Sequence, residues 1–222
     1  GISSDDDLNR ITLKDYISLG KGRKRSSATN KIAVIYAQGE IIYGKGDENN
    51  IGPELIINAL RKATDDKNVK AIVLRVNSPG GSALASELIW RELELTSVKL
   101  PIVVSMGNVA ASGGYYIACN ADAIFAEPTT ITGSIGVFGV LPNISELADN
   151  IGVNAEQVST NKGANYSVFE PMTDAFRTIT QEGVEQVYTT FLERVAKGRN
   201  MEVTEVDSIA QGRVWSGVEA IE

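Results

Sequence analysis

Four short apolar runs alternate with segments of helical spacing in the first half of the chain, and this alternation constrains the fold more than any other feature. The runs cover residues 31–37, 69–76, 101–105 and 123–126, and the helical segments cover 53–63, 83–95 and 115–121. This order is typical of an α/β fold with a parallel sheet and right-handed βαβ crossovers. The runs lack polar residues at alternate positions, so we expect strands that are covered on both faces.

The second half of the chain is less regular. Residues 129–140 combine glycines with β-forming residues, which predicts tight turns and a strand. A short helix is expected over 143–150 and a strand over 156–160. The longest helical pattern of the chain runs from 174 to 199, and a shorter helix follows over 203–211.

Residues 1–30 are polar and charged, and we interpret them as a linker or N-terminal extension before a single α/β domain at 31–222. Within this extension, the amphipathic stretch from Leu8 to Leu19 could dock on the domain. The basic run Lys21–Arg25 is expected to be solvated, because the chain as a whole is acidic. We find no internal repeat and no second domain.

The composition excludes several classes of function. The formal net charge of −7 and the pI of about 4.8 argue against nucleic acid as a partner. The chain has no histidine, which excludes a Ser-His-Asp triad and a histidine-based metal site within it. Its one cysteine, Cys119, lies in an apolar run and is expected to fill the core. No apolar run is long enough to cross a bilayer, and no signal peptide is expected at Gly1.

Ser112 lies where the third apolar run turns through small residues into a helical segment. Its neighbours Ala111, Gly113 and Gly114 would leave room for an approaching carbonyl group. A serine in this place can simply cap the helix, or it can act as a nucleophile beside the free N–H groups of the helix N-terminus. In a chain without histidine, a nucleophilic serine needs another base, for which a lysine kept neutral by burial is the best candidate.

A second glycine turn, Ser78-Pro79-Gly80-Gly81, follows the preceding strand. Both turns lie at the carboxyl ends of parallel strands, the edge at which ligands bind in such sheets. Amides of Gly80 or Gly81 and of Gly113 could therefore converge near Ser112 as an oxyanion hole. Each such donor contributes roughly 3 kcal/mol to lowering the reaction barrier.

Four motifs together resemble the S49 family of signal peptide peptidase A, a relative of the Clp protease and crotonase folds. The motifs lie at residues 76–81, 110–116, 132–137 and 212–217. The resemblance covers nearly the whole domain, and it implies that Ser112 is the nucleophile and that the Gly80-Gly81 turn and Gly113 supply the oxyanion donors. It further implies that Ser134 helps to hold a lysine base, although a Gly-Ser pair in a tight turn needs no catalytic reason. It implies no cofactor and no metal.

The chain departs from the family pattern at the lysine. In short family members the general base follows the strand that here is expected at 156–160, and the matching position is Tyr166. Lys162 is close in sequence but precedes the glycine. The lead-in Ile11–Tyr16 is similar to the linker of the long family form, which has two tandem copies and in which the N-terminal copy donates the lysine. The resemblance therefore implies that this chain is the serine-bearing C-terminal copy, weak or inactive alone.

For the whole protein, the resemblance implies a serine peptidase that cleaves extended apolar peptides, chiefly released signal peptides, in a ring-like homo-oligomer. It also implies a place at the bacterial inner membrane, with the catalytic domain on the outer, periplasmic side and an anchor outside this chain. Two alternatives stay open. One is a crotonase-type acyl-thioester enzyme, in which Ser112 would have no task, and the other is a non-catalytic scaffold copy.

Overall fold

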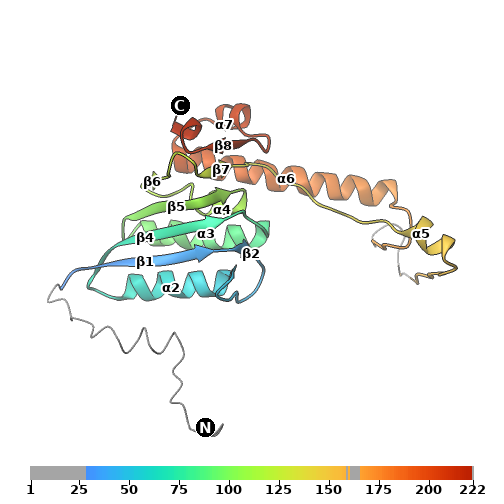
Figure 1. Ribbon diagram of the computed structural model, residues 1–222, viewed down its shortest axis with the longest axis horizontal. Helices are drawn as coiled ribbons and strands as arrows, with labels where there is room; N and C mark the ends of the chain where they lie inside the picture. The colour runs from blue at the N-terminus through green and yellow to red at the C-terminus, as the bar shows by residue number, and fades with distance from the viewer. Residues whose placement is uncertain (1–28, 159, 161–165, 222) are drawn as a thin grey trace, which may run out of the picture.

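The computed structural model describes residues 29–158, 160 and 166–221, so nearly all of the predicted linker, and Lys162, lie outside the described residues. Figure 1 shows the elements in order. The strands are β1 Lys31–Gln38, β2 Glu40–Ile41, β3 Asn50–Ile51, β4 Val69–Ser78, β5 Ile102–Ala111, β6 Ala123–Phe125, β7 Ile131–Gly133 and β8 Val214–Ser216. The helices are α2 Pro53–Asp65, α3 Ala83–Ser97, α4 Gly113–Tyr116, α5 Ser145–Asn150, α6 Asp174–Arg199, α7 Val203–Ile209 and a 3-10 turn at Glu219–Ile221.

The main sheet confirms the prediction of a mostly parallel α/β fold. Its strand order is β1-β4-β5-β7-β8, and β6 also pairs with β5. Every pairing in this sheet is parallel except that of β8, which runs antiparallel to β7. Helix α2 lies between β1 and β4 in the sequence and α3 between β4 and β5, as βαβ crossovers require.

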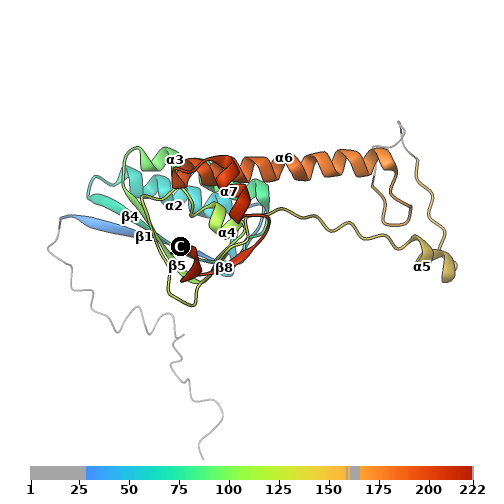
Figure 2. The same cartoon turned by 90° about the horizontal axis from the view of Figure 1, so that it is seen from above.

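Helices α2 and α3 cover one face of this sheet and form the core with it (Figure 2). Alternate side chains of β4 and β5, such as Leu74 and Val104, are fully buried against Leu60 of α2 and Ile89 of α3. Helix α2 begins at Pro53, whose fixed φ suits a first helical position. Helix α3 begins after Ser82, whose hydroxyl accepts a hydrogen bond from the Ala85 amide.

The opposite face of β1 and β4 is open, so the prediction of strands covered on both faces is wrong for the part of the chain that the structure describes. Ile32 and Tyr36 of β1 are 66% and 70% exposed, and Figure 2 shows α2 and α3 on the other side only. An apolar run shows that both faces of a strand are apolar. It does not show what covers them.

Three local predictions were also wrong. Strand β5 continues past Ser105 to Ala111, because its last residues pair with β7. The helix expected over 115–121 is the four-residue α4 followed by hydrogen-bonded turns. Over 156–160 the described residues form no strand. The isolated β-propensity of Gln157-Val158 is not enough where no neighbouring strand is available to pair.

Helix α6 matches its predicted bounds, but only its second half packs on the domain. Its buried residues are Phe191, Leu192, Val195 and Ala196. The first half projects away from the sheet, as does α5 (Figures 1 and 2). In the part of the chain that the structure describes, no helix is both long and apolar enough to cross a membrane.

Candidate active site

Ser112 lies at a strained turn between β5 and α4. Its φ of 51° and ψ of −122° are rare for a residue with a side chain and cost about 1–3 kcal/mol. Main-chain hydrogen bonds maintain this conformation: the Ser112 N–H donates to the Gly133 carbonyl at 2.9 Å, and its carbonyl accepts from the Tyr116 N–H at 2.9 Å. The Ser112 hydroxyl makes no capping hydrogen bond. The interpretation of Ser112 as a simple helix cap is therefore wrong.

The Gly80-Gly81 turn lies directly against Ser112. A Cβ on Gly80 would be 2.6 Å from the Gly113 nitrogen and 2.9 Å from the Ser112 Cβ, so this approach requires glycine. Gly80 and Gly81 have φ angles of 101° and 144°, which glycine adopts readily. The structure thus brings together the two turns that the sequence places 30 residues apart.

The main-chain N–H groups of this turn differ in availability. The Gly80 N–H donates to the Ser78 hydroxyl at 3.1 Å. Within the described residues, the N–H groups of Gly81 and Gly113 donate to no acceptor. A Cβ on Gly113 would be 3.3 Å from the Gly81 nitrogen, which shows how closely the two glycines approach. Gly81 and Gly113 are therefore the pair of free donors next to Ser112, and Gly80 is the residue whose small size permits their approach.

Ser134 is the first residue after β7, next to Ser112 in space. It also has a positive φ, 49°, and its N–H donates to the Arg213 carbonyl at 2.6 Å. Gly133, which precedes it, is paired in register with Ala111, which precedes Ser112. The parallel pairing of β5 and β7 therefore places both serines at the same edge of the sheet.

Both serines line one groove of about 960 Å³, which the middle of α6, from Gln181 to Phe191, also lines. Its walls are largely apolar and include Val137, Phe138, Val184, Val187, Tyr188 and Phe191. Glu40 and Glu185 are the charged side chains of its described lining, which contains no lysine and no arginine. The described lining of this groove therefore supplies no cationic side chain, and no lysine base, for Ser112. The described residues also hold no cluster of side chains suited to a metal ion.

Tyr166, the residue at the family's lysine position, is remote from this groove. Its hydroxyl donates to the Pro142 carbonyl, and its ring stacks on Phe176 with centroids 5.7 Å apart. It therefore belongs to the projecting part of the molecule, next to the start of α6.

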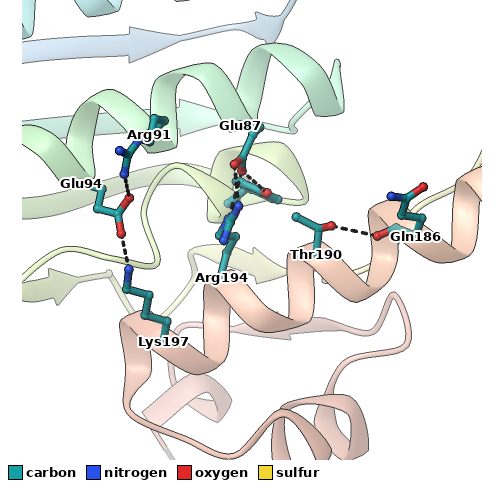
Figure 3. A network of polar contacts seen from close by, with 8 residues as sticks. Glu87, Arg91, Glu94, Gln186, Thr190, Arg194 and Lys197 are labelled. Atoms are coloured by element: carbon teal, nitrogen blue, oxygen red, sulfur yellow. Dashed lines mark hydrogen bonds and ion pairs between the residues drawn. The ribbon is translucent and has the colours of Figure 1, made fainter.

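A network of charged side chains, which the sequence analysis did not identify, joins the Ser112 turn to α3 and α6 (Figure 3). The Tyr116 hydroxyl donates to Glu87 of α3 at 2.5 Å, and Glu87 accepts from Arg194 of α6 at 2.8 and 3.2 Å. The Arg194 guanidinium also lies 4.3 Å from the ring centroid of Trp90. Burial, and then the bond to Glu87, raise the pKa of Tyr116, so it remains a protonated donor.

The neighbouring tyrosine, Tyr115, bonds directly to α6. The Tyr115 hydroxyl accepts a hydrogen bond from Arg199 of α6 at 2.7 Å. Helix α6 thus contacts both residues of the Tyr-Tyr pair: Arg199 bonds to the Tyr115 hydroxyl, and the Phe191 ring lies 4.6 Å from that of Tyr116, centroid to centroid. Cys119, one helical turn further on, is fully buried in the core as predicted, and burial raises the pKa of its thiol to about 12.

Comparison with known proteins agrees with this arrangement. The sequence profile described as peptidase family S49 matches residues 94–222, more than half of the chain. This chain belongs to peptidase family S49. The family resemblance inferred from the four motifs is therefore confirmed, and the mostly parallel α/β fold is consistent with the Clp protease and crotonase-like fold of that family.

Three relatives, each longer than this S49 chain, illustrate the comparison. Protease 4 of Haemophilus influenzae is 47% identical over the whole chain, which covers 36% of that protein. The chloroplastic serine protease SPPA of Arabidopsis thaliana is 37% identical over 99% of the chain, which covers 34% of it. A protein of Enterococcus faecium, provisionally named signal peptide peptidase SppA, is 36% identical over 88% of the chain and 59% of its own length. The chain thus spans about a third of the length of the first two.

Proposed function

We propose that this S49 domain is the serine-bearing part of a serine endopeptidase. One observation carries the proposal. The Ser112 hydroxyl makes no capping hydrogen bond, and it lies at a strained turn beside the N–H groups of Gly81 and Gly113, which have no acceptor within the described residues. A base would take the proton of the Ser112 hydroxyl as its oxygen attacks a peptide carbonyl carbon, and the two amides would bind the resulting oxyanion. The C–N bond then breaks, the base gives its proton to the leaving amine, and water hydrolyses the acyl-enzyme.

The base in this proposal is a neutral lysine from outside the described residues. A second S49 copy, N-terminal to this chain in a longer protein, is the favoured source, because Tyr166 occupies the family's lysine position here. The length of the Haemophilus and Arabidopsis relatives leaves room for such a copy. Ser134, which lines the same groove as Ser112, would help to hold the amine of this lysine. Lys162 is the alternative base within this chain.

The groove supports an extended apolar peptide as substrate. The main chain of residues 136–141 makes no hydrogen bond within the described residues, and its first part lines the groove. An extended peptide could pair with this segment while its side chains contact Val137, Phe138 and Phe191. Released signal peptides are the class that the family resemblance and the name of the Enterococcus relative suggest. A ring-like oligomer, anchored at the outer face of the inner membrane, completes the proposal.

Labelling with a fluorophosphonate tests the proposal. The reagent should label a full-length protein that contains this chain, and Ser112→Ala should abolish the labelling. The control Ser208→Ala changes an exposed serine of α7 and should leave the labelling normal. Label on the full-length protein but not on the isolated chain supports a split dyad. Strong label on the isolated chain would assign the base to Lys162. If neither form reacts, this domain is a scaffold and not a nucleophile-bearing peptidase.

A further inference from the structure

The open face of the main sheet carries mostly apolar side chains, with Arg75 and Ser105 as polar members, and strand register sets their arrangement. Two rows of side chains cross it from β1 to β6, because residues in register on parallel strands point to the same face. The rows are Val34, Val73, Val103 and Ala123, and then Tyr36, Arg75, Ser105 and Phe125. We call this set of eight residues the open sheet face.

Several of these side chains are exposed to a degree that is unusual for a sheet of this kind. Val34 is 50% exposed, Tyr36 70% and Phe125 63%. Ile32, near the start of β1, is 66% exposed. Parallel sheets are normally covered on both faces. A contiguous apolar patch on a soluble domain usually indicates a binding surface.

One cation lies in the middle of this apolar surface. Arg75 donates from Nη1 to the Ser105 hydroxyl at 2.8 Å and to the Met106 carbonyl at 2.6 Å. Its remaining N–H groups donate to no side chain within the described residues, and no carboxylate there forms an ion pair with it. A cover for this face should therefore be apolar with one acidic group near its centre.

We propose that residues 8–19 of this chain cover the open sheet face, with Asp15 paired to Arg75. Apolar residues recur at alternate positions in this stretch: Ile11 and Leu13 precede Asp15, and Ile17 and Leu19 follow it. An extended segment with this pattern presents one apolar side interrupted by a single carboxylate. That pattern complements the apolar side chains of the two rows and the central Arg75.

The connection between segment and sheet allows this docking. Residues 20–30 join Leu19 to Lys31, the first residue of β1. Eleven residues reach up to about 36–40 Å, whereas the eight residues of β1 span about 26 Å. The segment can therefore fold back along the whole of β1, the strand whose side chains are most exposed.

Cysteine accessibility tests the proposal on the complete 222-residue chain. Val34→Cys places a thiol on the open sheet face, and Lys62→Cys places a matched exposed thiol on α2, on the covered side. Native Cys119 is buried and should stay silent. We expect a polymer-linked maleimide to modify Val34→Cys at least tenfold more slowly than Lys62→Cys. Adding Asp15→Arg should remove most of this difference, whereas the control charge reversal Asp7→Arg should preserve it.

The possible outcomes distinguish an uncovered face, a face covered by a second copy of the chain and a face covered by residues 8–19. Equal modification of the two cysteines in the parent chain would overturn the proposal, because the face would then be uncovered. Protection that survives both Asp15→Arg and the double change Leu13→Asp/Ile17→Asp, and that increases with protein concentration, would overturn it in favour of a second copy. If the double change removes the protection of the cysteine at position 34 and Asp15→Arg does not, residues 8–19 cover the face but Asp15 does not pair with Arg75. Circular dichroism of each variant verifies the fold.

Discussion

Ser112 and Ser134 each follow one member of the register pair Ala111–Gly133, so the two serines leave adjacent parallel strands side by side. Their φ angles, 51° and 49°, are nearly the same, and both line the same groove. They are 22 residues apart in sequence. The pairing of β5 with β7 therefore creates a site with two serines, of which Ser112 directly precedes Gly113 and lies against the Gly80-Gly81 turn.

Gly80→Ala should disrupt the site through backbone contact. The added Cβ would lie 2.6 Å from the Gly113 nitrogen, at a φ of 101° that L-residues avoid. We expect a loss of about 2–4 kcal/mol in unfolding free energy, measured by urea denaturation, and a loss of fluorophosphonate labelling. Gly139→Ala is the matched control, since a Cβ there meets no atom within 4 Å. Full labelling of Gly80→Ala would show that the two turns do not need this approach.

Tyr116→Phe should show whether Tyr116 only positions the Ser112 turn or also takes part in proton transfer. It removes the hydrogen bond to Glu87 but leaves the Glu87–Arg194 ion pair in place. We expect about 1.5–3 kcal/mol less stability and slower labelling of Ser112 without a change in its pH profile. Tyr43→Phe, at a side chain that is 71% exposed, should change neither quantity. A shifted pH profile in Tyr116→Phe would instead give this tyrosine a part in proton transfer.

Stability should fall at alkaline pH because of the buried thiol. Burial raises the pKa of Cys119 from 9.0 to about 12, so above pH 9 the unfolded chain loses a proton that the folded chain retains. The contribution of this thiol is therefore constant below pH 9 and declines as the pH rises toward 12. Urea denaturation at pH 8 and at pH 10.5 should show the decline, and Cys119→Ala should reduce it. An equal decline in both proteins would exclude Cys119 as its source.

Val137→Pro should weaken peptide cleavage more than the reaction of Ser112 with a small reagent. Proline removes the N–H of a residue whose main chain has no partner within the described residues and which lines the groove. Loss of one hydrogen bond to substrate should lower kcat/KM for a peptide about tenfold in the full-length enzyme, with fluorophosphonate labelling preserved. Val137→Ala keeps the N–H and should retain most of the activity. Equal losses in the two variants would mean that the side chain, not main-chain pairing, binds the peptide.

The candidate site was the part of the molecule that the sequence described best, because its signals are local. Glycine turns after apolar runs fix where strands end, and the carboxyl ends of parallel strands meet at one edge. The approach of Gly80 to Gly113 follows from those two facts. Which amides remain free does not follow from them. The Gly80 N–H is bonded to the Ser78 hydroxyl, whereas the Gly81 N–H has no acceptor within the described residues.

The extent of strand β5 and the Glu87–Arg194 ion pair could not be predicted from the sequence. The extension of β5 to Ala111 depends on β7, a three-residue strand that is itself stable only when paired. Glu87 and Arg194 are 107 residues apart, and each alone resembles an ordinary charged residue on a helix surface. No periodic pattern links them, since the crossing of α3 and α6 brings them together.

The chain's own residues determined the order of helices and strands, the positions of the glycine turns and the absence of a histidine base, because backbone sterics and side-chain chemistry act over a few consecutive residues. Tertiary structure alone decided that α2 and α3 cover only one sheet face, that the Tyr116 hydroxyl is bound by Glu87 of α3, and that the described groove contains no lysine. Those outcomes depend on which distant surfaces meet, and that is set by packing of the whole chain rather than by any local pattern.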